Sequence, residues 1–124
     1  MEHNTIRLLR QILDRELVLH RELLAMARLR HILLCQGRID DLRALYPAEA
    51  RKVAELRHLE EMRGTLAPQI HDRVAPPDLA EATRRIGALI RRIGAVERAS
   101  WALLARHAVR VASADRGLAV WTPV

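Results

Sequence analysis

The chain has 124 residues, half of them hydrophobic, and a formal net charge of +6 at pH 7. This length suits a single domain with a modest core, and the hydrophobic content argues against intrinsic disorder. Because the chain has no Phe, one Tyr and two Trp, its core must be mainly aliphatic. The single cysteine, Cys35, excludes an internal disulfide and indicates a reducing compartment.

No apolar run is longer than five residues, whereas a helix that spans a bilayer needs about 20. Charged side chains recur every few residues from Glu2 onward, which is unlike the start of a signal peptide. We therefore expect a soluble, cytoplasmic protein that is not embedded in a membrane.

The first predicted helix spans about residues 5–36 and contains neither Gly nor Pro. Asn4 and Thr5 are suited to cap its start, and Gly37 is placed to end it. Its apolar residues cover about half of the circumference, more than the roughly 100° arc that packs on one neighbour. They form two adjacent stripes, one of Ile6, Leu9, Leu13, Leu17, His20, Leu24, Ala27 and His31 and one of Leu8, Ile12, Leu19, Leu23 and Met26. The first helix should therefore contact at least two other helices.

The second predicted helix spans about residues 40–66 and begins at Asp40 or Asp41, with a break at Pro47. Its leucines recur at spacings of three and four, which is typical of an amphipathic helix. A second amphipathic helix after a short turn should fold back on the first as an antiparallel hairpin.

The third predicted helix spans about residues 79–116, after a linker at 67–78 that ends in two prolines. A capping-box-like start precedes the apolar pattern, and Gly117 is placed to close the helix before a tail at 117–124. The sequence therefore predicts one all-α domain over residues 1–124. Its expected architecture is a long antiparallel helical hairpin plus a third long helix, a helical bundle with coiled-coil-like packing.

Residue types that carry catalysis or bind metals do not assemble into a recognisable site. Glu55 and His58 have the E-x-x-H spacing of di-iron bundles, but no second such motif is present. Cys35 lies at a helix C-terminus, which does not favour a reactive thiolate. The first helix faintly resembles the opening helix of all-helical chorismate mutases. No polar residues are convincingly placed around the only lysine, Lys52, to form the pocket that such an enzyme needs. We expect no enzyme activity, no metal, no cofactor and no small-molecule substrate.

The basic charge suggests one further alternative. From Arg84 to Arg116 the chain has eight basic and two acidic residues, and these arginines lie opposite the apolar stripe of the third helix. Such a face can follow a phosphate backbone, although the chain has few aromatic side chains for base stacking. A basic nucleic-acid-binding helical protein is therefore an alternative to a protein-binding one.

Two segments carry a resemblance to a known family. Leu33 to Leu45 reads LLCQGRIDDLRAL and Leu56 to Arg63 reads LRHLEEMR. These segments resemble the turn and the return helix of FlgN-type flagellar export chaperones. Chain length, the proline-containing linker and the long final helix are similar as well, so the resemblance extends over nearly the whole chain.

The resemblance implies a chaperone for hook-associated proteins at the hook–filament junction. It would cover their helical C-terminal segments in the cytoplasm and deliver them to the flagellar type III export apparatus. An amphipathic helix in an apolar groove is a common mode of such recognition. We expect the partner to bind the apolar stripe of the third helix, which comprises Ile86, Ile90, Ile93, Val96, Ser100, Trp101, Leu104, His107 and Val111.

Other interpretations of this stripe stay open at the level of the sequence. Its N-terminal half can equally form the core of a three-helix bundle, whereas beyond Val96 the hairpin is expected to be too short to cover it. A generic helical protein-interaction module and a homo-oligomer are further alternatives.

Overall fold

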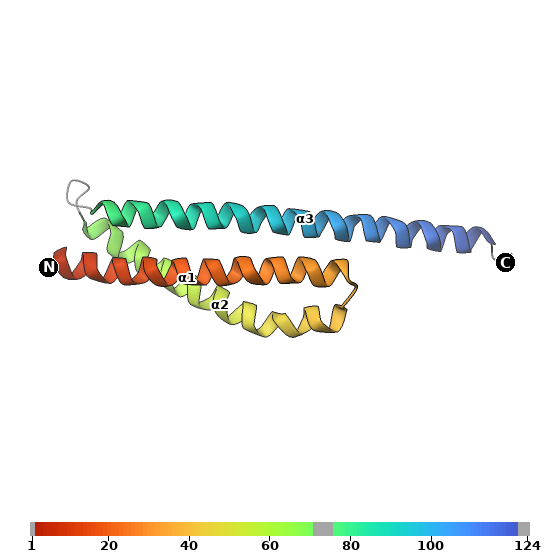
Figure 1. The fold of residues 1–124 in the computed structure, drawn as a ribbon, viewed down its shortest axis with the longest axis horizontal. Helices are drawn as coiled ribbons and strands as arrows, with labels where there is room; N and C mark the ends of the chain where they lie inside the picture. The colour runs from red at the N-terminus through yellow and green to blue at the C-terminus, as the bar shows by residue number, and fades with distance from the viewer. Residues whose placement is uncertain (1, 71–75, 122–124) are drawn as a thin grey trace.

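The computed structural model describes the backbone of residues 2–70 and 76–121, and the side chains of residues 3–70 and 76–108. Three long helices account for most of this region: α1 (Glu2–Cys35), α2 (Ile39–Leu66) and α3 (Pro77–Trp121). A short 3₁₀ helix, η1 (Ala67–Gln69), follows α2. The described residues contain no strand, which confirms the predicted all-α class (Figure 1).

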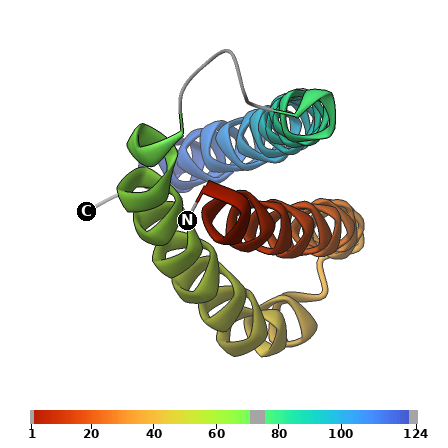
Figure 2. The same ribbon diagram turned by 90° about the vertical axis from the view of Figure 1, so that its left-hand side faces the viewer.

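Helix α1 lies at the centre of the molecule. Helix α2 folds back antiparallel to α1, and α3 then runs in the same direction as α1 (Figure 1). Both α2 and α3 pack on α1, but within the described residues no Cα atom of α2 comes within 8 Å of one in α3. Figure 2 shows α2 and α3 on different sides of α1 and diverging from each other. The prediction that the first helix contacts two others is thus confirmed.

The turn between α1 and α2 depends on Gly37. Its φ of +67° is the only positive φ among the described residues, and this left-handed conformation favours glycine because it has no Cβ. The backbone N–H of Arg38 donates to the carbonyl of Leu33 at 2.9 Å, and that of Gly37 donates to Leu34 at 3.1 Å. These bonds satisfy carbonyls at the end of α1, so α1 stops two residues before Gly37.

Several predicted boundaries differ from the structure. Helix α1 starts at Glu2, so Asn4 and Thr5 lie inside it and do not cap it. Helix α2 is continuous through Pro47, because packing on α1 holds both sides of the proline in one helix despite the lost N–H donor.

The ends of α3 differ from the prediction as well. It begins at Pro77, so the linker is shorter than predicted, and it continues beyond Gly117 to Trp121. Proline is well suited to the first position of a helix. One interior glycine costs about 1 kcal/mol, which is too little to end a long helix. The parts of the predicted linker and tail at 71–75 and 122–124 lie outside the described residues.

Aliphatic side chains hold α1 against α3. Leu13, Leu79 and Ile86 form a buried cluster, and the half-buried Ile6, Leu17 and Ala82 pack around it. Apolar burial of this kind provides most of the driving force for helix packing. Within the described part of the chain, no helix is both long enough and apolar enough to cross a membrane.

Candidate functional site

Polar contacts fix the register between α1 and α3. Arg10 Nε donates to Asp78 Oδ2 at 2.5 Å, and His31 Nδ1 is hydrogen-bonded to Ser100 Oγ at 3.0 Å. These pairs are separated by 68 and 69 residues in sequence. With this nearly constant offset, the last residue of α1, Cys35, lies opposite Leu103.

Helix α3 therefore extends past the end of α1. Residues 104–121 continue as helix without a facing turn of α1, over about 27 Å at 1.5 Å per residue. Figure 1 shows this blue segment projecting beyond the hairpin turn. We call residues 104–121 the α3 extension.

The structure divides the predicted binding stripe into a buried and an exposed part. Ile86 and Ser100 are buried against α1, with exposed fractions of 6% each, and Ile93 and Val96 are half-buried. In this conformation Ile86 and Ser100 are therefore not available to a partner. The sequence pattern could not distinguish these buried residues from the exposed ones, because both kinds lie on the same apolar face of the third helix.

The exposed part of the stripe comprises residues at the edge of the apolar face and residues beyond the end of α1. Ile90 is 51% exposed, Trp101 70% and Leu104 38%, and His107 is also exposed. The spacings from Ile90 to Trp101 and Leu104 place these three side chains along one side of the helix. The side chain of Val111 lies outside the described residues.

A surface groove of about 540 Å³ lies where α3 passes the hairpin turn. Its apolar lining comes from both ends of the turn and from the facing part of α3, and comprises Leu34, Ile39, Leu103 and Leu104. His107 and Arg106 border the groove on α3. The groove forms because α1 ends while α3 continues, so apolar side chains on α3 lose their neighbours.

Arg30 connects all three helices. Its guanidinium donates to Glu49 on α2 and to Glu97 on α3, the latter at 3.5 Å. Among the described side chains, it alone hydrogen-bonds to both α2 and α3. Near Arg30, α2 and α3 are therefore connected by polar contacts of a long side chain and not by apolar packing.

Tyr46 was not identified as a candidate from the sequence. It is 72% exposed and lines two shallow pockets of about 390 and 420 Å³, each of which also includes Arg30 and Glu49. The only feature that could have pointed to Tyr46 in the sequence is that it is the single tyrosine of the chain. One exposed aromatic residue does not by itself indicate a binding site.

Glu16 is a charged side chain in the interior, with an exposed fraction of 0%. Arg63 Nε donates to Glu16 Oε1 at 3.2 Å and lies 3.0 Å from Oε2, but Oε2 accepts no hydrogen bond from a described group. Burial raises the pKa of the Glu16 carboxyl above its ordinary value, although Arg63 opposes this rise. The nearby His20 is buried and its Nδ1 donates to the Glu16 carbonyl at 2.8 Å.

Two of the residues considered for catalysis, Glu55 and Lys52, have structural partners. Glu55 of the E-x-x-H motif accepts two hydrogen bonds from Arg15, at 2.8 and 3.0 Å, and Lys52 donates to Glu22 at 2.6 Å. Cys35 is a free, exposed thiol. Within the described residues, no group of three or more His, Cys, Asp or Glu is placed to hold a metal ion.

The fold and these surfaces define the molecule as an open three-helix bundle. In the described part of the chain, one side of α3 is not covered by another helix, and the α3 extension continues past the end of α1. Comparisons with known protein families, with curated protein sequences and with solved structures found no match.

Proposed function

We propose that this chain is a cytoplasmic export chaperone that binds helical C-terminal segments of hook-associated flagellar proteins. It prevents their premature assembly and aids their delivery to the type III export apparatus. The protein acts by binding another protein and not by catalysis. The resemblance of residues 33–45 and 56–63 to FlgN-type chaperones motivates the choice of partner.

The observation that carries the proposal is the length of α3 relative to α1. Beyond Leu103 no turn of α1 faces α3, and the large apolar side chains of Trp101 and Leu104 are exposed at this transition. An amphipathic helix from a partner can pack here in line with α1 and continue the same helix pairing. Exposed aromatic residues beside an apolar groove are typical anchors of such contacts.

Co-purification with individual hook-associated proteins tests this function. The full chain should form a complex with one or a few of them, and deletion of their helical C-terminal segments should abolish it. Replacing Trp101 by Ala should weaken binding by about tenfold or more, the usual effect of losing an aromatic anchor. Ile32→Ala is a matched control, because Ile32 is 50% exposed on α1 and should leave binding unchanged.

Two outcomes would contradict the proposal. One is equal retention of hook-associated proteins that lack their helical ends, and the other is no binding of any hook-associated protein. Capture of an unrelated helical protein through Trp101 would instead support the generic interaction module.

A further inference from the structure

We infer that the opening between α2 and α3 over Arg30 is a docking surface for an amphipathic helix with acidic flanks. This surface, here called the Arg30 surface, is formed by Arg30, Tyr46, Ile90 and Trp101. The inference rests on the proposed function in one respect, because it takes the exposed side of α3 as one wall. It adds a second wall on α2 and the charge of the partner.

The two aromatic residues lie on opposite sides of the Arg30 bridge. Tyr46 is three residues before Glu49, and Trp101 is four residues after Glu97. Side chains three or four apart are neighbours on a helix surface, so Tyr46 and Trp101 each neighbour one of the two glutamates that Arg30 binds. A helix lying over Arg30 can therefore contact Tyr46 on α2 and Trp101 on α3 at once.

The opening leaves room for a fourth helix. Because no Cα atom of α2 comes within 8 Å of one in α3 in the described region, these two helices do not cover each other's apolar sides. Tyr46 and Ile90 are more than half exposed as a result, and Val53 is only half-buried beside one of the Tyr46 pockets. A partner helix would complete a four-helix arrangement with α1, α2 and α3.

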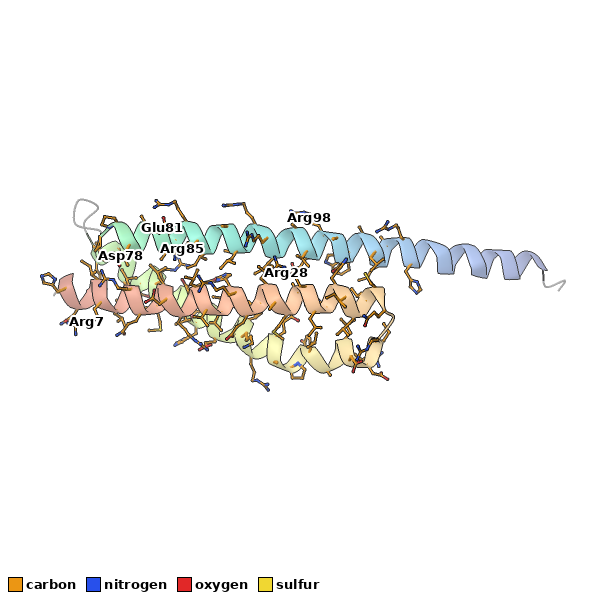
Figure 3. All side chains as sticks on the ribbon, in the orientation of Figure 1. Arg7, Arg28, Asp78, Glu81, Arg85 and Arg98 are labelled. Atoms are coloured by element: carbon orange, nitrogen blue, oxygen red, sulfur yellow. The ribbon has the colours of Figure 1, made fainter. Side chains whose placement is uncertain are left out.

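The rim of the surface is basic. Arg43 and Arg57 line the two Tyr46 pockets and are exposed. On α3, a Cβ added at Gly94 would lie 3.2 Å from Arg98 Nη1, so the Arg98 side chain runs back along its own helix. Figure 3 shows Arg98 at the edge of α3 that is turned away from α1. Among the described side chains, these three arginines form no ion pair.

Two acidic residues beside this rim share one cation. Arg30 binds both Glu49 and Glu97, which leaves one negative charge among the three groups. The three arginines of the rim outweigh this charge, so the net charge of the six side chains around the opening is positive. Asp and Glu on the flanks of a docked helix would complement it. A second copy of this chain is a poorer occupant, because its own net charge is +6 and the two rims would repel. The apolar residues between the arginines favour a helix over a phosphate backbone.

Two synthetic peptides test the inference against the full chain. Both carry Leu at the a and d positions of about three heptads, and the flanking positions are Glu in one and Lys in the other. The Glu peptide should bind with a dissociation constant at least about tenfold lower than that of the Lys peptide. Its affinity should fall as salt concentration rises. Fluorescence anisotropy of labelled peptide measures both.

Variants locate the binding surface. Tyr46→Ala, and separately the double change Arg43→Glu with Arg57→Glu, should each weaken binding of the Glu peptide by about tenfold. All three residues are exposed, so circular dichroism should show a folded chain. The matched control is Arg21→Glu with Arg28→Glu. Arg28 lies two residues before Arg30, about 200° around α1, and Arg21 lies one heptad earlier on the same side.

Equal affinity for the two peptides would overturn the inference, as would no binding of either. Unchanged binding by both α2 variants, with loss in Trp101→Ala, would restrict the contact to α3 and also overturn it. Tighter binding of a single-stranded oligonucleotide than of the Glu peptide would assign the basic rim to nucleic acid instead. Peptide binding without any binding of hook-associated proteins would refute only the proposed function, and the reverse result would refute only this inference.

Discussion

Replacing Glu16 by Met should raise the free energy of unfolding at pH 7 by about 1–4 kcal/mol, the range found when buried ion pairs are replaced by apolar residues of similar volume. The Glu16 side chain is fully buried, one of its oxygens accepts no hydrogen bond, and its cation, Arg63, is 37% exposed. Because only the carboxylate is fully buried, its attraction to Arg63 is too weak to offset the free energy that desolvation of the carboxylate costs. After the substitution, Arg63 can turn to solvent without leaving a buried charge.

The advantage of Met should depend on pH in a defined direction. Because burial raises the pKa of Glu16 in the folded chain above its ordinary value of 4.5, the folded state holds its proton more tightly than the unfolded one. The wild-type chain therefore loses stability as pH rises through the folded-state pKa. The difference between Glu16→Met and wild type should shrink as pH is lowered from 7 toward 4.5.

Urea denaturation followed by circular dichroism at several pH values measures this difference. Glu61→Met provides a control at an exposed position on α2, where the change should be within about 0.5 kcal/mol. Arg63→Ala should act in the opposite direction, because it leaves the Glu16 charge uncompensated. A Glu16→Met chain that is less stable than wild type at pH 7, or a difference that grows on acidification, would refute the reasoning.

Three further substitutions test the packing and the backbone by the same denaturation assay. Leu19→Ala removes a fully buried side chain and should cost about 2–5 kcal/mol; a cost below 1 kcal/mol would mean that α1 is not packed as described. Gly37→Ala should destabilise by about 1 kcal/mol because of the positive φ, whereas Gly64→Ala, with nothing within 4 Å of the new Cβ, should stabilise α2 by about 0.5–1 kcal/mol. Equal effects at the two glycines would contradict this contrast. Pro47→Ala should restore an N–H donor inside α2 and raise stability by up to about 3 kcal/mol; a loss of stability would show that the proline contributes through packing.

Much of the secondary structure was predictable because the helix signals are local. The hairpin turn follows from Gly37, and the periodicity of the leucines predicts α1 and α2. Pro47 and Gly117 were misleading for a physical reason. Each lowers helix propensity at one position, but the favourable turns on either side outweigh a single unfavourable residue.

The candidate binding surface was predictable only in part. The pattern identified the apolar stripe of α3 correctly as a face, but it could not show that Ser100 pairs with His31 while Trp101 remains exposed. Neighbouring positions on one helix face can differ this much because burial depends on which other helix covers them. Arg30 was missed because its contact with Glu97 on α3 joins residues 67 positions apart, and Tyr46 because it lines its pockets together with Arg30 of another helix.

By itself, the sequence determined that this chain is helical, that its core is aliphatic and that its third helix is basic. These properties follow from residue type and spacing, which act within a few residues of each other. Only the tertiary structure decided that α1 lies between α2 and α3, that these two diverge, and that α3 continues past the end of α1. Those features depend on packing and polar contacts between residues far apart in the chain, such as His31 and Ser100, which are 69 positions apart. No local pattern specifies such a register.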